Sequence, residues 1–260
     1  MSGLQSHYEK QILTLTLSRP DCHNAFDDNL LKALTQSLQD IYNHDHARCV
    51  VIKAQGKHFC AGADLNWMKR MAQYSEEENL SDSMILANAM QSIYQCPVPT
   101  ICLVQGAAMG GGAGLAAASN ITIATDTARF CFSEAKLGLI PAVISPYVVE
   151  AIGPRAAKHL FCTAEKFDAQ QAKALGLVNQ IVGVDELDQA GALICEQIKQ
   201  NAPQAVRDCK QLVDLVKHKQ ISSTILQQTA QLIASKRVSV EGQKGLQAFL
   251  SKSPINWSKS

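Results

Sequence analysis

The chain has 260 residues, of which 47% are hydrophobic and 18% charged, as in a globular protein with one large domain or one domain and a small appendage. Its formal net charge of +1 provides no basic field for nucleic acid or a membrane surface. No apolar run reaches transmembrane length, and the N-terminus has neither a secretory nor a transit pattern. We therefore expect a cytoplasmic protein, with a matrix protein that has lost its leader as the alternative in an organism with mitochondria.

Nine cysteines, an odd number, are scattered along the chain without a C-x-x-C pair. Most lie in apolar runs, where a reduced cysteine behaves as a small hydrophobe, so a reducing compartment is the simplest interpretation. The tripeptide His44-Asp45-His46 has the composition of a metal site. It falls in a polar loop with no third ligand nearby, and we expect no metal.

The predicted elements begin with a strand over 12–17, where apolar and polar residues alternate. Asp27 or Asp28 then caps a helix that carries leucines on one face. A second strand covers 49–54, and a helix starts near Leu65.

The middle of the chain repeats this rhythm. A helix over 80–94 is stopped by two prolines, and a strand over 100–104 leads through a glycine triplet into a helix of small residues over 112–119. Two short strands follow, at 121–124 and 129–132.

From Asp168 to the end the pattern is mostly helical, with helix starts near Asp168, Asp185, Pro203 and Ser222. Strand–strand–helix repeats followed by helices predict an α/β fold with a helical C-terminal region. We divide the chain into a core, 1–200, and a helical C-terminal region, 201–260, with the boundary somewhere in 195–205.

Two glycine turns carry the first chemical signal. One is Phe59-Cys60-Ala61-Gly62-Ala63-Asp64, and the other is Gly110-Gly111-Gly112. Each follows a strand-like run and leads into a helix, so unpaired N–H groups point away from the helix start. Brought together, two such turns could aim two N–H groups at one oxygen, as the enolate of a thioester requires.

Glu134 carries the second signal. It ends a predicted strand after Phe130, Cys131 and Phe132, where desolvation would raise the pKa of its carboxyl and suit it to moving protons near neutral pH. Each feature alone has a simpler interpretation: the glycines as a close helix–strand contact, and Glu134 as a surface carboxylate. Only the combination indicates a site.

Six motifs in order resemble the enoyl-CoA hydratase/isomerase (crotonase) superfamily over nearly the whole chain. They are Asn24-Ala25, the turn 59–64, the segment 106–114, Phe132-Ser133-Glu134, Leu137-Gly138-Leu139-Ile140-Pro141 and Ala172-Lys173-Ala174-Leu175-Gly176-Leu177-Val178. The resemblance implies a spiral of ββα repeats with a helical C-terminal trimerisation region, a homotrimer or a hexamer as a dimer of trimers, and an acyl-CoA thioester as substrate. Coenzyme A would then be part of the substrate, and no separate cofactor is expected.

The resemblance also implies roles for individual residues. It places the oxyanion-hole N–H groups on Ala63 and Gly111 and a catalytic carboxylate on Glu134. Phe249 and Lys252 match residues that in relatives cover the adenine and the 3′-phosphate of coenzyme A. The full set of expected substrate-binding residues is Ala61, Asp64, Leu65, Gly110, Gly114, Phe249 and Lys252, although Asp64 by itself would also favour the dipole of the helix that it begins.

Two departures from the family pattern bear on the reaction. Gly114 stands where typical hydratases carry a second glutamate, so chemistry by an isomerase with a single carboxylate stays open. After Pro141, where many hydratases are rich in glycine, the chain reads Ala142-Val143-Ile144-Ser145-Pro146-Tyr147. With the segment 63–68, this resembles the branch that hydrates 3-branched glutaconyl-CoA thioesters, namely 3-methylglutaconyl-CoA of leucine breakdown and its isohexenyl analogue of acyclic terpene breakdown.

A second class of function is an RNA-binding module, because one relative of the methylglutaconyl hydratase type binds RNA through a lysine-studded first helix. Here the helix expected over 28–42 has Lys32 as its only basic residue, so the electrostatic footprint for RNA is missing. The sequence therefore predicts an enoyl-CoA hydratase first, a double-bond isomerase second and an RNA-binding module last.

Overall fold

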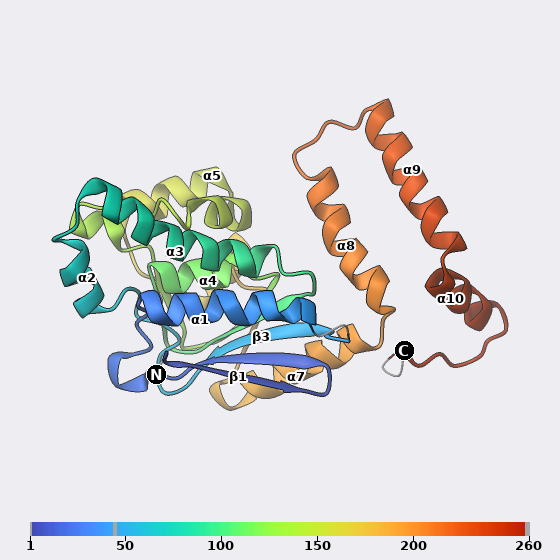
Figure 1. The fold of residues 1–260 in the computed structure, drawn as a ribbon, viewed down its shortest axis with the longest axis horizontal. Coiled ribbons are helices and arrows are strands. Elements are labelled where there is room, and N and C mark those ends of the chain that lie inside the picture. Colours follow the sequence, from blue (N-terminus) through green and yellow to red (C-terminus); the bar gives the residue numbers. More distant parts are fainter. Residues whose placement is uncertain (1, 44–45, 258–260) are drawn as a thin grey trace. The chain divides into compact units, whose positions relative to one another are not determined.

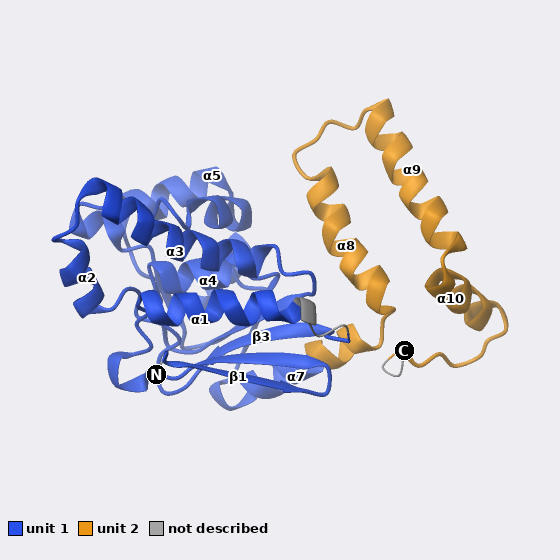
Figure 2. Ribbon diagram, viewed as in Figure 1, with its two compact units in different colours: residues 1–193 blue, residues 194–260 orange. Residues whose placement is uncertain are grey.

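The computed structural model describes residues 2–43 and 46–257, so His44 and Asp45 of the polar loop lie outside the described residues. The chain forms two compact units, 1–193 and 194–260 (Figures 1 and 2). The first unit holds both sheets and the helices that cover them, and the second is helical. This is the α/β class that the sequence predicts.

The larger sheet has the strand order β1-β2-β3-β4-β6-β9. The first pair is antiparallel and all later pairs are parallel. Every residue of β4 is buried, as expected for a parallel strand covered on both faces. The strands span Leu4–Glu9 (β1), Ile12–Leu17 (β2), Cys49–Ala54 (β3), Thr100–Val104 (β4), Ile121–Thr125 (β6) and Gln180–Val182 (β9).

The predicted alternation of β2 is confirmed, because Leu13, Leu15 and Leu17 are buried while the residues between them are half-buried. Helix α1 (Asp28–Gln39) joins the same core through its four buried leucines. Its predicted cap is also confirmed, since the Asp27 carboxylate accepts a 2.9 Å hydrogen bond from the Leu30 N–H.

A smaller sheet has the strand order β5-β7-β8. The chain passes repeatedly from a strand of the large sheet to a strand of the small sheet and then to a helix, and so forms a spiral. Strand β4 is followed by β5 (Ala107–Met109) and α4 (Gly111–Ala118), and β6 is followed by β7 (Arg129–Cys131) and α5 (Ser145–Thr163). The same order occurs after β3, where Cys60 bridges to β5 before α2 (Leu65–Met71) begins. Each turn is thus one ββα repeat.

Several elements of the structure are not predicted from the sequence. Strand β1 is polar and exposed at a sheet edge, while β5, β8 (Phe167–Asp168) and β9 are too short for a periodic signal. Helix α5 was not expected because it carries Pro146 and Pro154, but Pro146 lies in its first turn and Gly153 bends the chain at the second proline. The region after Asp168 is therefore helical with one strand of the large sheet inside it.

The remaining first-unit helices are α3 (Glu76–Tyr94) and α6 (Ala169–Leu175), and the unit boundary falls within α7 (Leu187–Lys199). Short 3₁₀ helices occur at Pro20–Cys22, Asp40–Asn43, Glu134–Leu137 and Val184–Glu186. The second unit contains α8 (Pro203–Val216), α9 (Ser223–Val238) and α10 (Val240–Leu250). The predicted helix starts near Pro203 and Ser222 are confirmed for α8 and α9, and the Ser222 hydroxyl caps α9.

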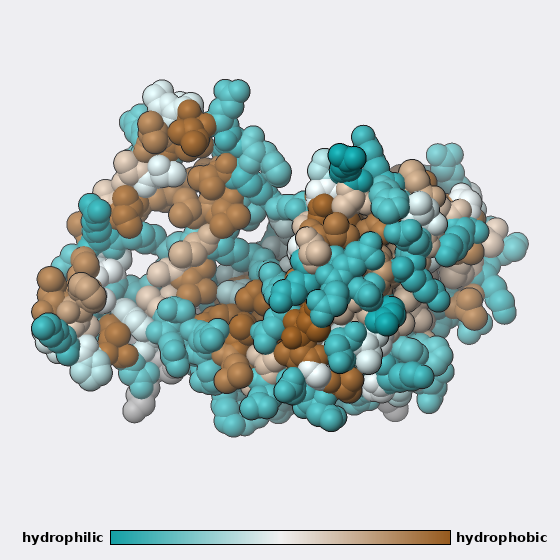
Figure 3. Space-filling model, turned by 180° about the vertical axis from the view of Figure 1, so that it is seen from behind, coloured by the Kyte–Doolittle hydropathy of each residue, from teal (hydrophilic) through white to brown (hydrophobic). Residues whose placement is uncertain are grey.

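Helices α8–α10, all described, contain no fully buried residue. Brown, hydrophobic surface lies over the second unit in Figure 3. The exposed large apolar side chains of α8–α10 are Leu212, Val213, Val216, Leu226, Leu232, Ile233, Val238, Val240, Leu246, Phe249 and Leu250. Within the described ranges, no helix is both long and apolar enough to span a membrane.

Candidate active site

Pairing in the small sheet brings the three predicted site residues together. Cys60 bridges to β5, and β5 pairs with β7 in parallel. Ala63, Gly111 and Glu134 lie a few residues beyond these paired points, at the carboxyl ends of the three segments. Because the segments run in the same direction, their following turns lie side by side at one edge of the sheet.

The N–H of Ala63 is left free by the way the first turn pairs with Phe26. The Phe26 N–H donates to the Gly62 carbonyl at 2.9 Å, and the Phe26 carbonyl accepts from the Asp64 N–H at 2.8 Å. The residues on either side of Ala63 thus face Phe26, so the N–H of Ala63 points the other way. Among the described residues it has no hydrogen-bond acceptor.

Gly111 offers the second donor as the first residue of α4. The first hydrogen bond within the helix runs from the Gly114 N–H to the Gly110 carbonyl at 3.1 Å. The N–H of Gly111 is therefore one of the unpaired donors at the positive end of the helix.

Phe26 connects the two turns. Besides its backbone bonds to the first turn, its ring lies where a Cβ on Gly111 would stand, so only glycine permits this approach. The same ring meets Trp67 of α2 edge-on, with centroids 5.9 Å apart. One buried aromatic side chain thus sets the spacing between the turns that carry the two donors.

Glu134 lies beside the second turn. A Cβ built on Gly110 would stand 3.1 Å from Glu134 Oε1, and Gly110 has φ +50°, which also favours glycine. Glu134 Oε2 is buried and has no hydrogen-bond partner among the described residues. This burial raises the pKa of the Glu134 carboxyl above its ordinary value, a property typical of a carboxylate that moves protons near neutral pH.

The two departures from the family pattern meet in space. Gly114 is buried in α4, and a Cβ on it would overlap Cγ2 of Ile144 and lie 3.2 Å from Cε of Met90. The segment after Pro141 thus fills the space that a side chain at position 114 would need. Without a shift of Ile144, residue 114 cannot carry a second carboxylate.

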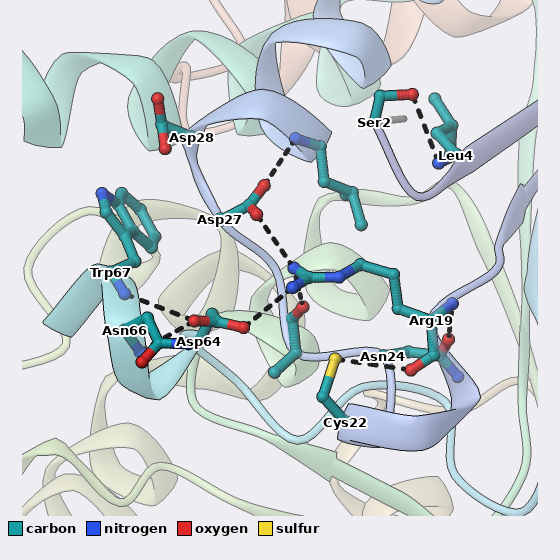
Figure 4. Close-up of polar contacts among 12 residues, drawn as sticks. Ser2, Leu4, Arg19, Cys22, Asn24, Asp27, Asp28, Asp64, Asn66 and Trp67 are labelled. Atoms are coloured by element: carbon teal, nitrogen blue, oxygen red, sulfur yellow. Dashed lines mark hydrogen bonds and ion pairs between the residues drawn. The ribbon is translucent and has the colours of Figure 1, made fainter.

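The carboxylate of Asp64 is held by contacts to the protein itself. Its carboxylate accepts from the N–H groups of Asn66 and Trp67 at 2.8 and 3.3 Å and pairs with Arg19 at 2.8 Å (Figure 4). Burial by itself would raise the pKa of Asp64, but these two N–H groups and the guanidinium hold it below the ordinary value. The contacts favour the structural role of Asp64 as a helix cap.

The other expected binding residues lie apart from these contacts. Leu65 is 73% exposed at the start of α2, and the exposed Ala61 donates its N–H to the His23 carbonyl at 3.0 Å. Phe249 and Lys252 belong to the second unit, and their role toward coenzyme A stays a prediction.

Two residues that matter to the turns were not singled out from the sequence. Phe26 directly follows the Asn24-Ala25 motif, and Arg19 lies two residues after the end of β2. Their positions beside a recognisable motif were a signal, but their contacts depend on segments distant in the chain.

No group of three His, Cys, Asp or Glu side chains within residues 2–43 and 46–257 is placed to hold a metal ion. A cavity of about 200 Å³ lies between α3, α4 and α5 and is lined by residues such as Tyr94, Asn120 and Glu150. Its lining includes none of the residues of the three turns, so it is separate from the candidate site.

The spiral of ββα repeats, with turns that present free N–H groups beside a buried carboxylate, defines an α/β protein of the crotonase type. The chain belongs to the enoyl-CoA hydratase/isomerase family, whose model matches residues 7–260.

Relatives agree with this assignment over most of the chain. The crystal structure of a Legionella pneumophila protein that is described as a candidate enoyl-CoA hydratase/isomerase (crotonase) has 54% sequence identity and a TM-score of 0.95, with 99% of both chains covered. A Thermus thermophilus protein assigned to the enoyl-CoA hydratases is 35% identical over 78% of this chain and 80% of its own length. The 1,2-epoxyphenylacetyl-CoA isomerase of Escherichia coli is 29% identical over 97% of each chain.

Proposed function

We propose that the protein is an enoyl-CoA hydratase that adds water across the C2=C3 bond of an acyl-CoA thioester. The observation that carries the proposal is the Glu134 carboxylate, which has a buried oxygen without a hydrogen-bond partner among the described residues and lies beside the turn that begins α4. The free N–H groups of Ala63 and Gly111 would hold the thioester oxygen, and coenzyme A enters as part of the substrate.

The proposed reaction uses one carboxylate twice. Glu134 removes a proton from water as the water oxygen bonds to C3, and the electron pair of the double bond moves toward the thioester. The negative charge then develops on the thioester oxygen, where the two N–H groups stabilise it. The protonated Glu134 returns its proton to C2 as the enolate collapses, so one water molecule is added in all.

A double-bond isomerase is the second candidate. It is favoured by the absence of a second carboxylate at Gly114, whose space Ile144 and Met90 fill, and by the family, which includes isomerases as well as hydratases. In this reaction Glu134 would move a proton between C2 and C4 through the same enolate, and no water would be consumed.

For the substrate we propose a 3-branched glutaconyl-CoA thioester. Support comes from the resemblance of segments 63–68 and 142–147 to that branch, and from the crowding at Gly114. Where the protein cannot supply a second carboxylate, the free carboxylate of the substrate can help to hold the water.

The exposed apolar faces of α8–α10 support a homotrimer or hexamer, and we expect the enzyme to act in the cytoplasm.

Product masses test the proposal. The protein is incubated with crotonyl-CoA, 3-methylglutaconyl-CoA and trans-3-hexenoyl-CoA, with Glu134→Gln as the inactive control. A gain of one water on the glutaconyl thioester supports the hydratase. An unchanged mass with a shifted double bond in the hexenoyl thioester, and no hydration of the other two, would establish the isomerase instead.

A further inference from the structure

We infer that Arg19 is a positioning residue that holds the Ala63 N–H in line with the Gly111 N–H; the inference rests on the proposed function of Ala63. The guanidinium of Arg19 contacts three acceptors, one in the first turn and two in the segment around Phe26 that pairs with it (Figure 4). It lies 2.8 Å from Asp64 Oδ2, 3.1 Å from Asp27 Oδ2 and 2.8 Å from the carbonyl oxygen of Ala25.

These three acceptors surround the pairing that orients Ala63. Ala25 and Asp27 are the chain neighbours of Phe26, and Asp64 is the residue after Ala63. Phe26 itself pairs with the residues on both sides of Ala63. Arg19 therefore ties together the two segments whose separation decides where the Ala63 N–H points.

The same acceptors fix two helices. The Asp27 carboxylate caps α1 by accepting from the N–H of Leu30, and the Asp64 carboxylate caps α2 by accepting from the N–H groups of Asn66 and Trp67. Arg19 thus connects two helix starts to each other, and the first turn lies between them.

The contacts are of a kind that only arginine makes. The Arg19 side chain is 24% exposed and the Asp64 side chain 11%, so both charges are largely removed from water. The planar guanidinium donates in several fixed directions at once, whereas a lysine ammonium is a point charge on a flexible stem. Lysine at position 19 would keep the charge but not the three simultaneous contacts.

A misplaced oxyanion-hole N–H group lowers the catalytic rate strongly. A displacement of about 1 Å near the reacting atoms can cost about 10²-fold, and loss of one oxyanion-hole donor costs about 10²–10³-fold in kcat. A donor that is loosened rather than lost should produce a smaller loss, concentrated in kcat, because the interaction strengthens in the transition state.

The test compares Arg19→Lys and Arg19→Met with Arg70→Met. Arg70 also pairs with an aspartate, Asp28, at 2.7 Å. Within the described residues it makes no hydrogen bond or ion pair to the first turn, so it serves as the ion-pair control. We expect both Arg19 variants to lose about tenfold or more in kcat with KM changed less than about threefold, and Arg70→Met to keep the kcat of the wild type.

A readout that does not depend on turnover accompanies the kinetics. The absorption of a conjugated aryl-enoyl-CoA shifts to longer wavelength when its thioester carbonyl is polarised. We expect the shift on binding to be smaller in both Arg19 variants than in the wild type and in Arg70→Met. Melting temperatures and circular dichroism show that the compared proteins are folded, and Arg19→Lys keeps the test decisive if Arg19→Met does not fold.

Ala63→Pro separates a failure of this inference from a failure of the proposed function. If Ala63→Pro is inactive while folded Arg19→Lys keeps both the kcat and the spectral shift of the wild type, Arg19 serves stability alone and the inference is wrong. If folded Ala63→Pro keeps full activity, the donor is elsewhere and the proposed role of Ala63 fails first.

Discussion

One buried carboxylate oxygen of Glu134 bears both on the proposed role of this residue as proton carrier and on its effect on stability. Its Oε2 atom is shielded from water without a hydrogen-bond partner in the described part of the chain, and this raises the pKa of the carboxyl. Glu134→Gln keeps the shape and removes the proton carrier, so we expect a loss of about 10²–10⁴-fold in kcat with thioester binding retained. A loss of less than about threefold in steady-state kcat would assign the proton transfer to another residue.

The same substitution should change stability in a pH-dependent way. Because the pKa of Glu134 is raised in the folded protein from an ordinary value of 4.5, its contribution to stability is fully present below that value and is lost as pH rises through the folded pKa. Above its folded pKa, the wild type therefore carries a half-buried charge that Glu134→Gln lacks. We expect the variant to melt a few degrees above the wild type at pH 8, with a smaller difference at pH 4, in thermal scans by circular dichroism. An equal difference at both pH values would contradict this origin.

Ala63→Pro tests the first donor because proline has no N–H. We expect a loss of about 10²–10³-fold in kcat, while Ala63→Ser, which keeps the N–H, stays active. Circular dichroism must show that both variants are folded. Equal activities of the two folded variants would place the donor at another residue.

At the scale of elements, Gly114 of α4 packs against Ile144, the residue directly before α5. A glutamate at position 114 would overlap Ile144, and overpacking of this kind costs about 1–3 kcal/mol. We expect Gly114→Glu alone to lower the melting temperature by several degrees without a gain in hydration.

Gly114→Glu combined with Ile144→Ala should restore room for the second carboxylate and raise the rate of crotonyl-CoA hydration above that of the wild type, with Ile144→Ala alone as the control. Crotonyl-CoA hydration by the wild type as fast as that of a glutaconyl thioester would rule out help from the substrate's carboxylate.

The elements with a strong period or a clear cap could be predicted from the sequence. Strand β2 alternates, and α1, α6 and α9 begin at side chains that cap them. Strand β1 could not be predicted, because it is held by pairing with β2 rather than by burial of its own side chains.

The candidate site also contains residues that the sequence predicts and residues that it does not. Ala63, Gly111 and Glu134 could be singled out because glycine turns and a strand-end carboxylate are local signals. Arg19, and Ile144 as the neighbour of Gly114, could not, because their contacts join residues about 45 and 30 positions apart and depend on how the turns of the spiral stack.

For the whole molecule, the second unit exposes many large apolar side chains. Ile233, Val238 and Val240 are 52, 78 and 89% exposed, which is more than a monomer stabilised by its own core would leave in one region. A second copy of the chain, packed by the apolar faces of α8–α10, would bury this surface.

Sedimentation and melting should reveal the assembly. We expect the intact chain to sediment as a trimer or a hexamer and its melting temperature to rise with protein concentration, because association stabilises the folded state by mass action. A strict monomer at micromolar concentration would contradict the proposed assembly.

Deletion of the residues after Val238 removes α10 with Phe249 and Lys252, and should weaken coenzyme A binding in titration calorimetry.

The contact between Phe26 and Trp67 has an optical consequence. The chain has two tryptophans: Trp67 in the first unit, where it also donates to Asp82 at 3.0 Å, and Trp257 in the second. In a Trp257→Phe variant, all indole fluorescence would arise from a buried ring that touches the same phenylalanine as both glycine turns. Its emission would follow thioester binding at the turns in real time, without a label and without turnover.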